Sequence, residues 1–478
     1  MEKYMMMAAV VMLAISAFGA EIVVPTDQPT ISAAIAAANA LDWIKLEPGT
    51  YTESGLVVTQ SVNIVAKDIW EPDYQGPSAY IIQAAPAPGT ATDRIFTVTG
   101  GNLVLQGLTI RHGNVTDNGG AIHASGVGTH LTLSDCIIVN NTSVTGNGGA
   151  IYSNQANPNI WECVFTGNIA AGSGGAIYAS SAGINMFISS TTIASNQSLD
   201  GAGIWIGDCS AYISNNAITG NSASGDGGGI YLNLTLPGLN GYIANNTLSG
   251  NSAGRGGGIY TAASGSTPTL RHLTVASNSA SLAPNQGGGV YASGTIAPDL
   301  RACIIANNTA STGTDIYGTV NSLDYSLIEN TTDTTITGTT TNNITGTDPL
   351  LGPLADNGGP TMTHALQPGS PALDKIPQAE FTDWQDQRQA PRNQTTSPDG
   401  DIGAYELFVD DWGATMINCW QQAPPDNDTI QIMVSFNQLA INFNDISDLV
   451  IVTGADDEPV TMTYLEPSPG SFRRIRKR

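Results

Sequence analysis

The stretch IWECVFTGNIAAGSGGAIY, residues 160–178, holds one unit of a repeat that runs through the middle of the chain. Its landmarks are an asparagine, Asn168, and a glycine-rich turn that ends in a β-branched residue, Ile177. The asparagine returns every 25 to 30 residues, at Asn114, Asn141, Asn168, Asn196, Asn221, Asn251, Asn278 and Asn308. The β-branched residue keeps the same step, at Ile122, Ile151, Ile177, Ile204, Ile230, Ile259 and Val290. Two columns with one period indicate a short unit stacked on itself.

Apolar residues fill two further columns of the repeat, eight and three positions before each asparagine. The first is Leu133, Ile160, Ile188, Ile213, Ile243, Leu270 and Leu300, and the second is Ile138, Phe165, Ile193, Ile218, Leu248, Val275 and Ile305. The two residues between the strands, such as Ser134-Asp135 or Arg271-His272, are expected to form an exposed corner. Each asparagine is expected to adopt the left-handed conformation and to bond to its counterparts in neighbouring rungs. Parallel strands about 4.8 Å apart then enclose one core, which predicts an all-β, right-handed parallel β-helix.

Changes in sequence character suggest domain boundaries. Residues 1–19 are typical of a secretory signal, with a positive start, an apolar run and a small-residue cleavage site. Residues 20–330 are assigned to the β-helix, with an N-terminal cap at about 20–55 and regular rungs at about 100–315. Residues 331–407 are predicted to close the end of the β-helix. Residues 408–478 are interpreted as a linker and a partial Ig-like or β-sandwich-like tail, which looks incomplete at Arg478.

The cap contains a short helix, expected over Ala33 to Leu41, that would cover the open end of the coil. With the following Pro48-Gly49-Thr50-Tyr51, this stretch resembles the entry segment of pectin-lyase-like β-helix proteins.

The composition restricts the class of partner. The net charge is −24, and charged residues are only 12% of the chain. Such a surface repels nucleic acid and anionic lipid, so neither is an expected partner. Apart from the signal peptide, no stretch is long and apolar enough to cross a membrane as a helix. Three of the five cysteines, Cys136, Cys163 and Cys303, share one column. They are interpreted as small apolar filler, and the sequence leaves open whether Cys136 and Cys163 form a disulfide.

Parts of the chain resemble two known protein families. The turns Gly119-Gly120-Ala121-Ile122, Gly148-Gly149-Ala150-Ile151 and Gly174-Gly175-Ala176-Ile177 resemble the GGAI repeat of polymorphic outer membrane proteins, and Phe165-Thr166-Gly167-Asn168 resembles their FxxN element. This resemblance implies an exported β-helical passenger of the bacterial cell envelope or outer membrane, often an adhesin. The chain departs from that family in lacking a C-terminal run long enough for a membrane β-barrel.

A second set of motifs lies after the regular rungs. It comprises Asn357-Gly358-Gly359-Pro360-Thr361, Thr363-His364-Ala365-Leu366, Pro368-Gly369-Ser370-Pro371-Ala372-Leu373-Asp374, Asp386-Gln387-Arg388 with Arg392, and Asp401-Ile402-Gly403-Ala404-Tyr405-Glu406. These motifs resemble the choice-of-anchor Q domain, which closes β-helices in bacterial surface and secreted proteins and has no assigned catalytic role. Gln389 stands where that family usually has glycine.

One outward column is aromatic. After each glycine-rich turn the chain carries His123, Tyr152, Tyr178, Trp205, Tyr231, Tyr260 and Tyr291. Because the preceding residue is buried, alternation along the strand places this column outside. The stripe is a candidate platform for sugar rings, with Tyr152, Tyr178, Trp205, Tyr231, Tyr260 and Tyr291 as the ligand-binding residues. The alternative is that stacked aromatic rings only stabilise the parallel ladder.

The candidate for catalysis is the column that precedes the glycines. It places Asp200, Asp226 and Arg255 on consecutive rungs. Asp200 and Asp226 are candidate ligands for Ca²⁺, and Asp226 and Arg255 are candidate catalytic residues, as in lyases that act on acidic polysaccharides. The alternative is ordinary loop charge, with Asp226 and Arg255 weakly paired. A second possible pair of carboxylates, Asp135 and Glu162, lies in the corner column. The only arginines of that column, Arg271 and Arg301, are four or more rungs away, which is too far for one site.

The sequence therefore favours an exported, secreted or surface-attached bacterial β-helix scaffold without catalytic activity or cofactor. Adhesion or carbohydrate binding is the expected function, with glycans or host-cell macromolecules as partners. The alternative is a Ca²⁺-dependent, pectate-lyase-like polysaccharide lyase or hydrolase, since β-helices host both enzymes and binding proteins. The sequence does not determine the ligand, the mode of cell retention or the oligomeric state.

Overall fold

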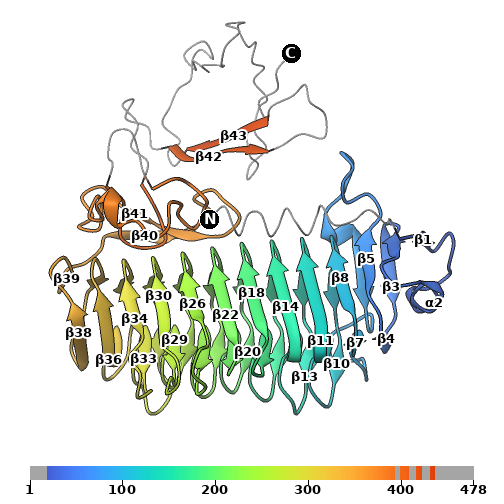
Figure 1. Ribbon diagram of the computed structural model, residues 1–478, viewed down its shortest axis with the longest axis horizontal. Helices are drawn as coiled ribbons and strands as arrows, with labels where there is room; N and C mark the ends of the chain where they lie inside the picture. Colours follow the sequence, from blue (N-terminus) through green and yellow to red (C-terminus); the bar gives the residue numbers. More distant parts are fainter. Residues whose placement is uncertain (1–18, 393–398, 408–415, 423–430, 437–478) are drawn as a thin grey trace, which may run out of the picture.

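The computed structural model describes residues 19–392 and 399–407 with their side chains, and the backbone of two later strands, 416–422 and 431–436. The molecule is an all-β parallel solenoid of about 10 turns with 3% helix, which confirms the predicted β-helix (Figure 1). The expected signal peptide and most of the expected tail lie outside the described residues. Within the described part, no helix is long and apolar enough to cross a membrane.

Three parallel sheets form the solenoid. The first contains β1 (Glu21–Val24), β2 (Trp43–Leu46), β4 (Leu56–Val58), β5 (Val62–Ala66), β7 (Phe96–Val98), β8 (Asn102–Gln106), β11 (Ile122–Ser134), β14 (Ile151–Trp161), β17 (Ile177–Ser180), β18 (Asn185–Ser189), β21 (Ile204–Gly207), β22 (Ser210–Ser214), β25 (Ile230–Asn233), β26 (Gly241–Ala244), β29 (Ile259–Thr261), β30 (Pro268–Arg271), β33 (Val290–Ala292), β34 (Asp299–Arg301), β36 (Ile316–Leu323) and β38 (Thr334–Thr339). The second contains β3 (Gly49–Thr52), β6 (Tyr80–Gln83), β9 (Thr109–Arg111), β12 (Ile137–Val139), β15 (Val164–Thr166), β19 (Thr192–Ala194), β23 (Ala217–Thr219), β27 (Thr247–Ser249), β31 (Thr274–Ala276), β35 (Ile304–Ala306), β37 (Leu327–Ile328) and β39 (Ile344–Thr345). The third contains β10 (Asn114–Val115), β13 (Thr142–Ser143), β16 (Ile169–Ala170), β20 (Gln197–Ser198), β24 (Ser222–Ala223), β28 (Ser252–Ala253) and β32 (Ser279–Ala280).

The two predicted apolar columns line the core. Every residue of these two columns is at most 1% exposed. The register stacks each rung directly on the last, with Ile138 paired to Phe165 and Phe165 to Ile193. The cysteine column also points inward, and Cys136, Cys163 and Cys303 are free and buried.

The asparagines form a continuous buried ladder from Asn141 to Asn308. From Asn168 onward, the side-chain oxygen of each asparagine accepts hydrogen bonds from the backbone N–H and the side-chain Nδ2 of the asparagine one rung earlier, at 2.9 to 3.1 Å. The expectation for Asn114 was wrong. It pairs with Thr142, so Gly113 occupies the ladder position and donates its N–H to Asn141. The Asn114 side chain instead donates to the carbonyl of Ala91.

The expected left-handed conformation belongs to the residue before each ladder asparagine. Asn140, Gly167, Ser195, Gly220, Gly250, Ser277 and Asn307 have φ between 55° and 67°. The turn is made at this position, and the following asparagine then directs its amide inward along the ladder. The positions therefore carry Gly, Asn or Ser, of which Gly and Asn adopt positive φ most readily.

The corners are less exposed than predicted. Ser134 and His272 are 3% and 1% exposed, respectively. Other parts of the chain cover them: the Tyr74 hydroxyl donates to Asp135 at 2.8 Å, and Thr382 contacts the His272 ring. Their burial depends on residues far away in sequence, which the repeat pattern does not contain.

The N-terminal cap is the helix α2, Ile31–Ala37, which begins and ends earlier than expected. Thr30 caps its start by accepting the Ala33 N–H, and Glu53 accepts the N–H groups of Ile31 and Ser32. Ile31 and Ala34 are fully buried, so the helix covers the apolar end of the coil.

After the last rung the chain turns back along the side of the solenoid. Residues 349–407, which we call the closing segment, contain the antiparallel strands β40 (Leu351–Ala355) and β41 (Thr363–Leu366). Figure 1 shows these strands beside the rungs. The segment contacts the solenoid laterally, as when Gly403 donates to the Ala302 carbonyl and Ala404 to Thr274. Short 3₁₀ turns occur at Pro77–Ala79 and Gln378–Glu380, and β42 (Met416–Gln422) pairs antiparallel with β43 (Gln431–Phe436).

Candidate functional site

The aromatic stripe is a stack of rings along the outer face of the first sheet. From Tyr152 to Tyr291, consecutive centroids are 4.4 to 5.9 Å apart and ring planes differ by at most 20°. His123 meets Tyr152 edge-on, with an interplanar angle of 87°. The structure adds Tyr317, whose ring stacks on Tyr291 at 5.1 Å. The repeat pattern missed it because Gly313-Thr314-Asp315-Ile316 has only one glycine in its turn.

The rings of the stripe cover one another. Tyr260 is only 6% exposed, and the other members are half-buried. Because inner rings have neighbours on both faces, the half-buried members expose mainly their edges. Some hydroxyls already have partners: Asn154 donates to Tyr152 and Ser293 to Tyr260. The stripe therefore presents a row of polar ring edges.

Gly207 makes room for the one indole in the stripe. A Cβ at this position would lie 2.4 Å from two atoms of the Trp205 ring. The large ring thus extends over the backbone of its own strand. Its neighbours Tyr178 and Tyr231 lie 4.4 and 5.9 Å away, centroid to centroid.

The candidate catalytic column is occupied by contacts within the protein. Arg255 donates to both carboxylate oxygens of Asp226, at 2.8 and 2.5 Å. The same guanidinium lies 5.3 Å from the centroids of Tyr260 and Tyr291. The ion pair raises the pKa of Arg255, chiefly through the hydrogen bond to Asp226. Asp226 and Arg255 therefore lie together, but each already has a partner.

Asp200 lies one rung before Asp226 and accepts its backbone N–H at 2.8 Å. Asn118 likewise accepts the backbone N–H of Asn147, and Asn147 accepts that of Ser173. Burial raises the pKa of Asp200. Within the described residues, no group of three or more His, Cys, Asp or Glu side chains is arranged to hold a metal ion. The column is therefore a second polar ladder, in which Asp200 accepts a backbone N–H and Asp226 binds the Arg255 side chain.

The sequence reasoning missed a second aromatic column on the same sheet. Phe187 stacks on Tyr212 with centroids 5.0 Å apart, and Tyr212 approaches Tyr242 at 6.2 Å. Phe187 is 43% exposed, whereas the Tyr242 hydroxyl donates to Asp383 of the closing segment. The signal was present in the outward residue before each buried Ile188, Ile213 and Ile243.

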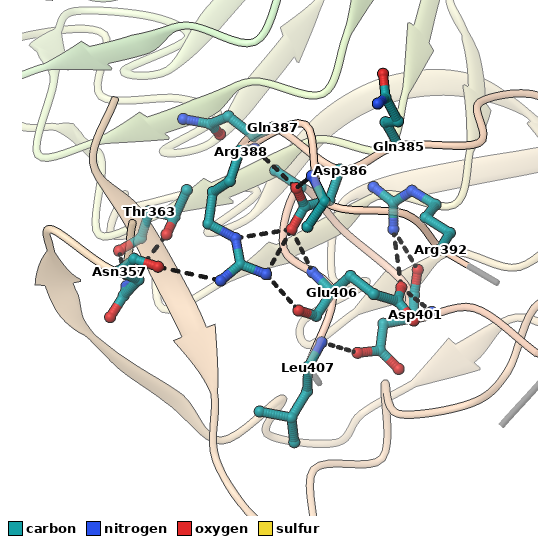
Figure 2. A network of polar contacts seen from close by, with 12 residues as sticks. Asn357, Thr363, Gln385, Asp386, Gln387, Arg388, Arg392, Asp401, Glu406 and Leu407 are labelled. Carbon is teal, nitrogen blue, oxygen red and sulfur yellow. Dashed lines mark hydrogen bonds and ion pairs between the residues drawn. The ribbon is translucent and has the colours of Figure 1, made fainter. Parts of the chain in front are cut away.

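The motifs of the closing segment meet in a buried polar cluster, which we call the clasp (Figure 2). It consists of Asp386, Arg388, Arg392, Asp401 and Glu406, each at most 2% exposed. Arg388 pairs with Asp386, with Nη2 and Oδ2 2.7 Å apart, and Arg392 pairs with Glu406 at 3.4 Å. These residues resemble motif positions of the choice-of-anchor Q domain, and here they hold the segment together.

Hydrogen bonds also fix the clasp to the solenoid. Arg392 donates to the side chain of Asn245 at 3.0 Å, and Thr247 donates to Gln387 at 2.7 Å. The ring of His364 bonds to Ser249 at 2.9 Å. Burial lowers the pKa of His364, which keeps this ring neutral near pH 7.

The comparisons with known proteins agree with this architecture. Residues 135–154 and 162–180 match the model of the Chlamydia polymorphic membrane protein repeat. No curated protein and no solved structure matched the chain. The choice-of-anchor Q resemblance stays a prediction. The chain is therefore a parallel β-solenoid in which two neighbouring segments match the polymorphic membrane protein repeat.

Proposed function

We propose that the protein is an exported surface scaffold that acts in adhesion without catalysis. Support comes first from the repeats, because polymorphic membrane proteins are surface-exposed bacterial proteins of the outer membrane. The family association favours adhesion. Glycans or macromolecules of another cell are the proposed partners.

The shape of the solenoid suits display. The second sheet has 12 strands, so its 11 intervals extend over about 53 Å at about 4.8 Å each. A rod with a core continuous from end to end holds surface side chains at fixed spacing. Such repeated positions favour a ligand that contacts several rungs, because linked contacts raise the overall affinity.

The observation that carries the proposal is the aromatic stripe. It places one aromatic ring per rung from Tyr152 to Tyr317, in a protein of strongly negative net charge. Phenol hydroxyls hydrogen-bond to sugar hydroxyls, and ring edges supply apolar contact. We therefore place glycan binding at Tyr152, Tyr178, Trp205, Tyr231, Tyr260 and Tyr291. The proposed contact is with ring edges, because stacking covers the faces of the inner rings.

The lyase alternative has weaker support. A general base needs a free carboxylate near the substrate, whereas both oxygens of Asp226 bind Arg255. We therefore do not propose it.

A glycan array and a cell-adhesion assay test the proposal with the purified chain. Replacing Tyr178 and Tyr231 together by Phe removes two hydroxyls but keeps the stack, and we expect at least a fivefold loss of affinity. Tyr212→Phe, in the second aromatic column, is the matched control and is expected to bind normally. Binding unchanged in the double variant excludes the stripe as the site. No binding to any glycan or cell type excludes adhesion itself.

A further inference from the structure

The two aromatic columns of the first sheet differ in how much ring face they leave open. In the aromatic stripe the inner rings have neighbours on both faces, whereas Phe187 is the first ring of the second column. One face of Phe187 stacks on Tyr212, with ring planes 8° apart. The residue paired with Phe187 on the preceding rung is Asn159, so the other face has no aromatic neighbour in the described part of the chain. Phe187 is 43% exposed, more than any ring of the stripe.

The side chains beside this free face are short. Asn159 pairs with Phe187 in the register of β14 and β18, and Thr132 of β11 pairs with Asn159 one rung earlier. A phenyl ring is longer than either side chain, so Phe187 stands above them. Trp161 follows on the same outer side of β14, two positions and about 7 Å along the strand from Asn159, and is 41% exposed. We call Thr132, Asn159, Trp161 and Phe187 the step.

Asn159 contributes a free amide to the step. Its neighbour Asn157 already accepts the backbone N–H of Asn185 at 2.8 Å. The Asn159 side chain, in contrast, makes no hydrogen bond to any residue that the structure describes. Its amide can therefore donate to and accept from hydroxyl groups of a ligand. Two exposed aromatic rings with one amide between them suit a ligand that has an apolar face and a rim of hydroxyl groups.

A pyranose sugar has both features, because C–H groups form an apolar face and hydroxyl groups surround its edge. We propose that the step binds one neutral pyranose unit, which stacks on the free face of Phe187, contacts Trp161 and hydrogen-bonds to Asn159. This inference rests on the proposed glycan binding. It adds a subsite at which the face of an aromatic ring, and not only its edge, is open to the sugar.

The charge around the step favours a neutral sugar over an acidic one. None of the four residues of the step is charged, and the carboxyl groups of Asp135 and Glu162 lie at the adjacent corner. The chain as a whole has a net charge of −24. The carboxylate of a uronic acid would therefore be repelled, whereas an uncharged hexose is not.

The step is separate from the stripe. Six residues of β14 lie between Tyr152, which belongs to the stripe, and Asn159. The backbone turns between them at Gln155, where φ is 63°. One sugar unit therefore contacts the step or the stripe but not both, so substitutions in the two places test different contacts.

Titration calorimetry with the full chain tests the step. The probes are neutral oligosaccharides of glucose, galactose, mannose and N-acetylglucosamine, with oligogalacturonate as the acidic counterpart. Phe187→Ala removes the ring face, so the affinity for the neutral probe that binds the wild type should fall at least about tenfold. Phe187→Tyr keeps the ring face and should bind like the wild type. Trp70→Ala, which removes another exposed aromatic ring outside the step, is the control and should also bind normally.

Unchanged affinity in Phe187→Ala overturns the step but leaves the proposed function standing on the double variant at Tyr178 and Tyr231. If Phe187→Ala fails to fold, Trp161→Ala decides, and it should weaken binding at least about threefold. Tighter binding of oligogalacturonate than of every neutral probe also overturns the proposal. So does a wild type that binds no neutral probe, whereas the proposed function fails only if the glycan array and the cell-adhesion assay are negative as well.

Discussion

Asp315 closes the asparagine ladder by accepting the side-chain N–H of Asn308 at 2.8 Å. It also accepts the backbone N–H of Asn308 and, through its other oxygen, that of Asn330. The ladder amides all donate towards this end, so a carboxyl group here terminates a row of aligned dipoles. Gly113 supplies the donor at the opposite end.

Asp315 makes the stability of the ladder end depend on pH. Burial raises its pKa from 3.8 to about 6. The raised pKa means that the contribution is fully present below pH 3.8 and is lost as pH rises through 6, with a total of about 3 kcal/mol. In Asp315→Asn this dependence disappears. The free energy of unfolding of the wild type relative to this variant should therefore fall between pH 4 and 7, measured by urea denaturation at each pH. An equal difference at all pH values contradicts the assignment.

The buried ladder predicts a large effect for a single truncation in its middle. Asn221→Ala removes the acceptor of two donors on Asn196 and the donor to the Ile193 carbonyl. Leaving these buried groups unpaired should lower the free energy of unfolding by about 3 kcal/mol or more. Asn114→Ala is the matched control, because Asn114 lies outside the ladder, and it should cost less than about 1 kcal/mol. Similar denaturation midpoints for the two variants would contradict the ladder.

Gly207→Ala should disturb the aromatic stripe. The new methyl group would overlap the Trp205 ring, so the indole must leave its position between Tyr178 and Tyr231. We expect a weaker near-ultraviolet circular dichroism signal, a shifted tryptophan emission and a loss of about 1–3 kcal/mol. Gly49→Ala, where the added Cβ meets only ordinary contacts, is the control. An unchanged spectrum in Gly207→Ala would show that the ring is placed differently.

The sequence predicted the features that recur from rung to rung. It missed the contacts that distant parts of the chain make with a rung. The apolar columns and the ladder from Asn141 to Asn308 follow from one period, because each rung contacts only its neighbours. The sequence pattern wrongly assigned Asn114 to the ladder. The residue before it, Gly113, occupies the ladder position and contributes only its backbone N–H. The burial of His272 depends on Thr382, which is 110 positions away.

Prediction of the candidate site from the sequence is limited in the same way. Alternation placed the stripe on the outer face, and stacking of the rings was the alternative that the sequence offered. The sequence did not show that this stacking covers the ring faces on which a sugar would lie. The sequence indicates at most a weak surface contact between Asp226 and Arg255. The structure shows a bidentate pair beside two aromatic rings, because the column is partly enclosed by the neighbouring stripe.

Asp226→Ala separates a structural from a catalytic role for this column. Removing the carboxylate leaves Arg255 without its bidentate partner, which should lower the free energy of unfolding by about 1–2 kcal/mol after solvent screening is allowed for. Arg255→Ala should have a similar effect, and the double variant should cost less than the sum of the two, because the residues interact directly. Release of unsaturated uronides from pectin in the presence of Ca²⁺ should be absent in the wild type and in all three variants. Uronide release by the wild type that disappears in Asp226→Ala would instead establish the lyase, because loss of a 1–2 kcal/mol stabilising contact does not abolish activity in a protein that remains folded.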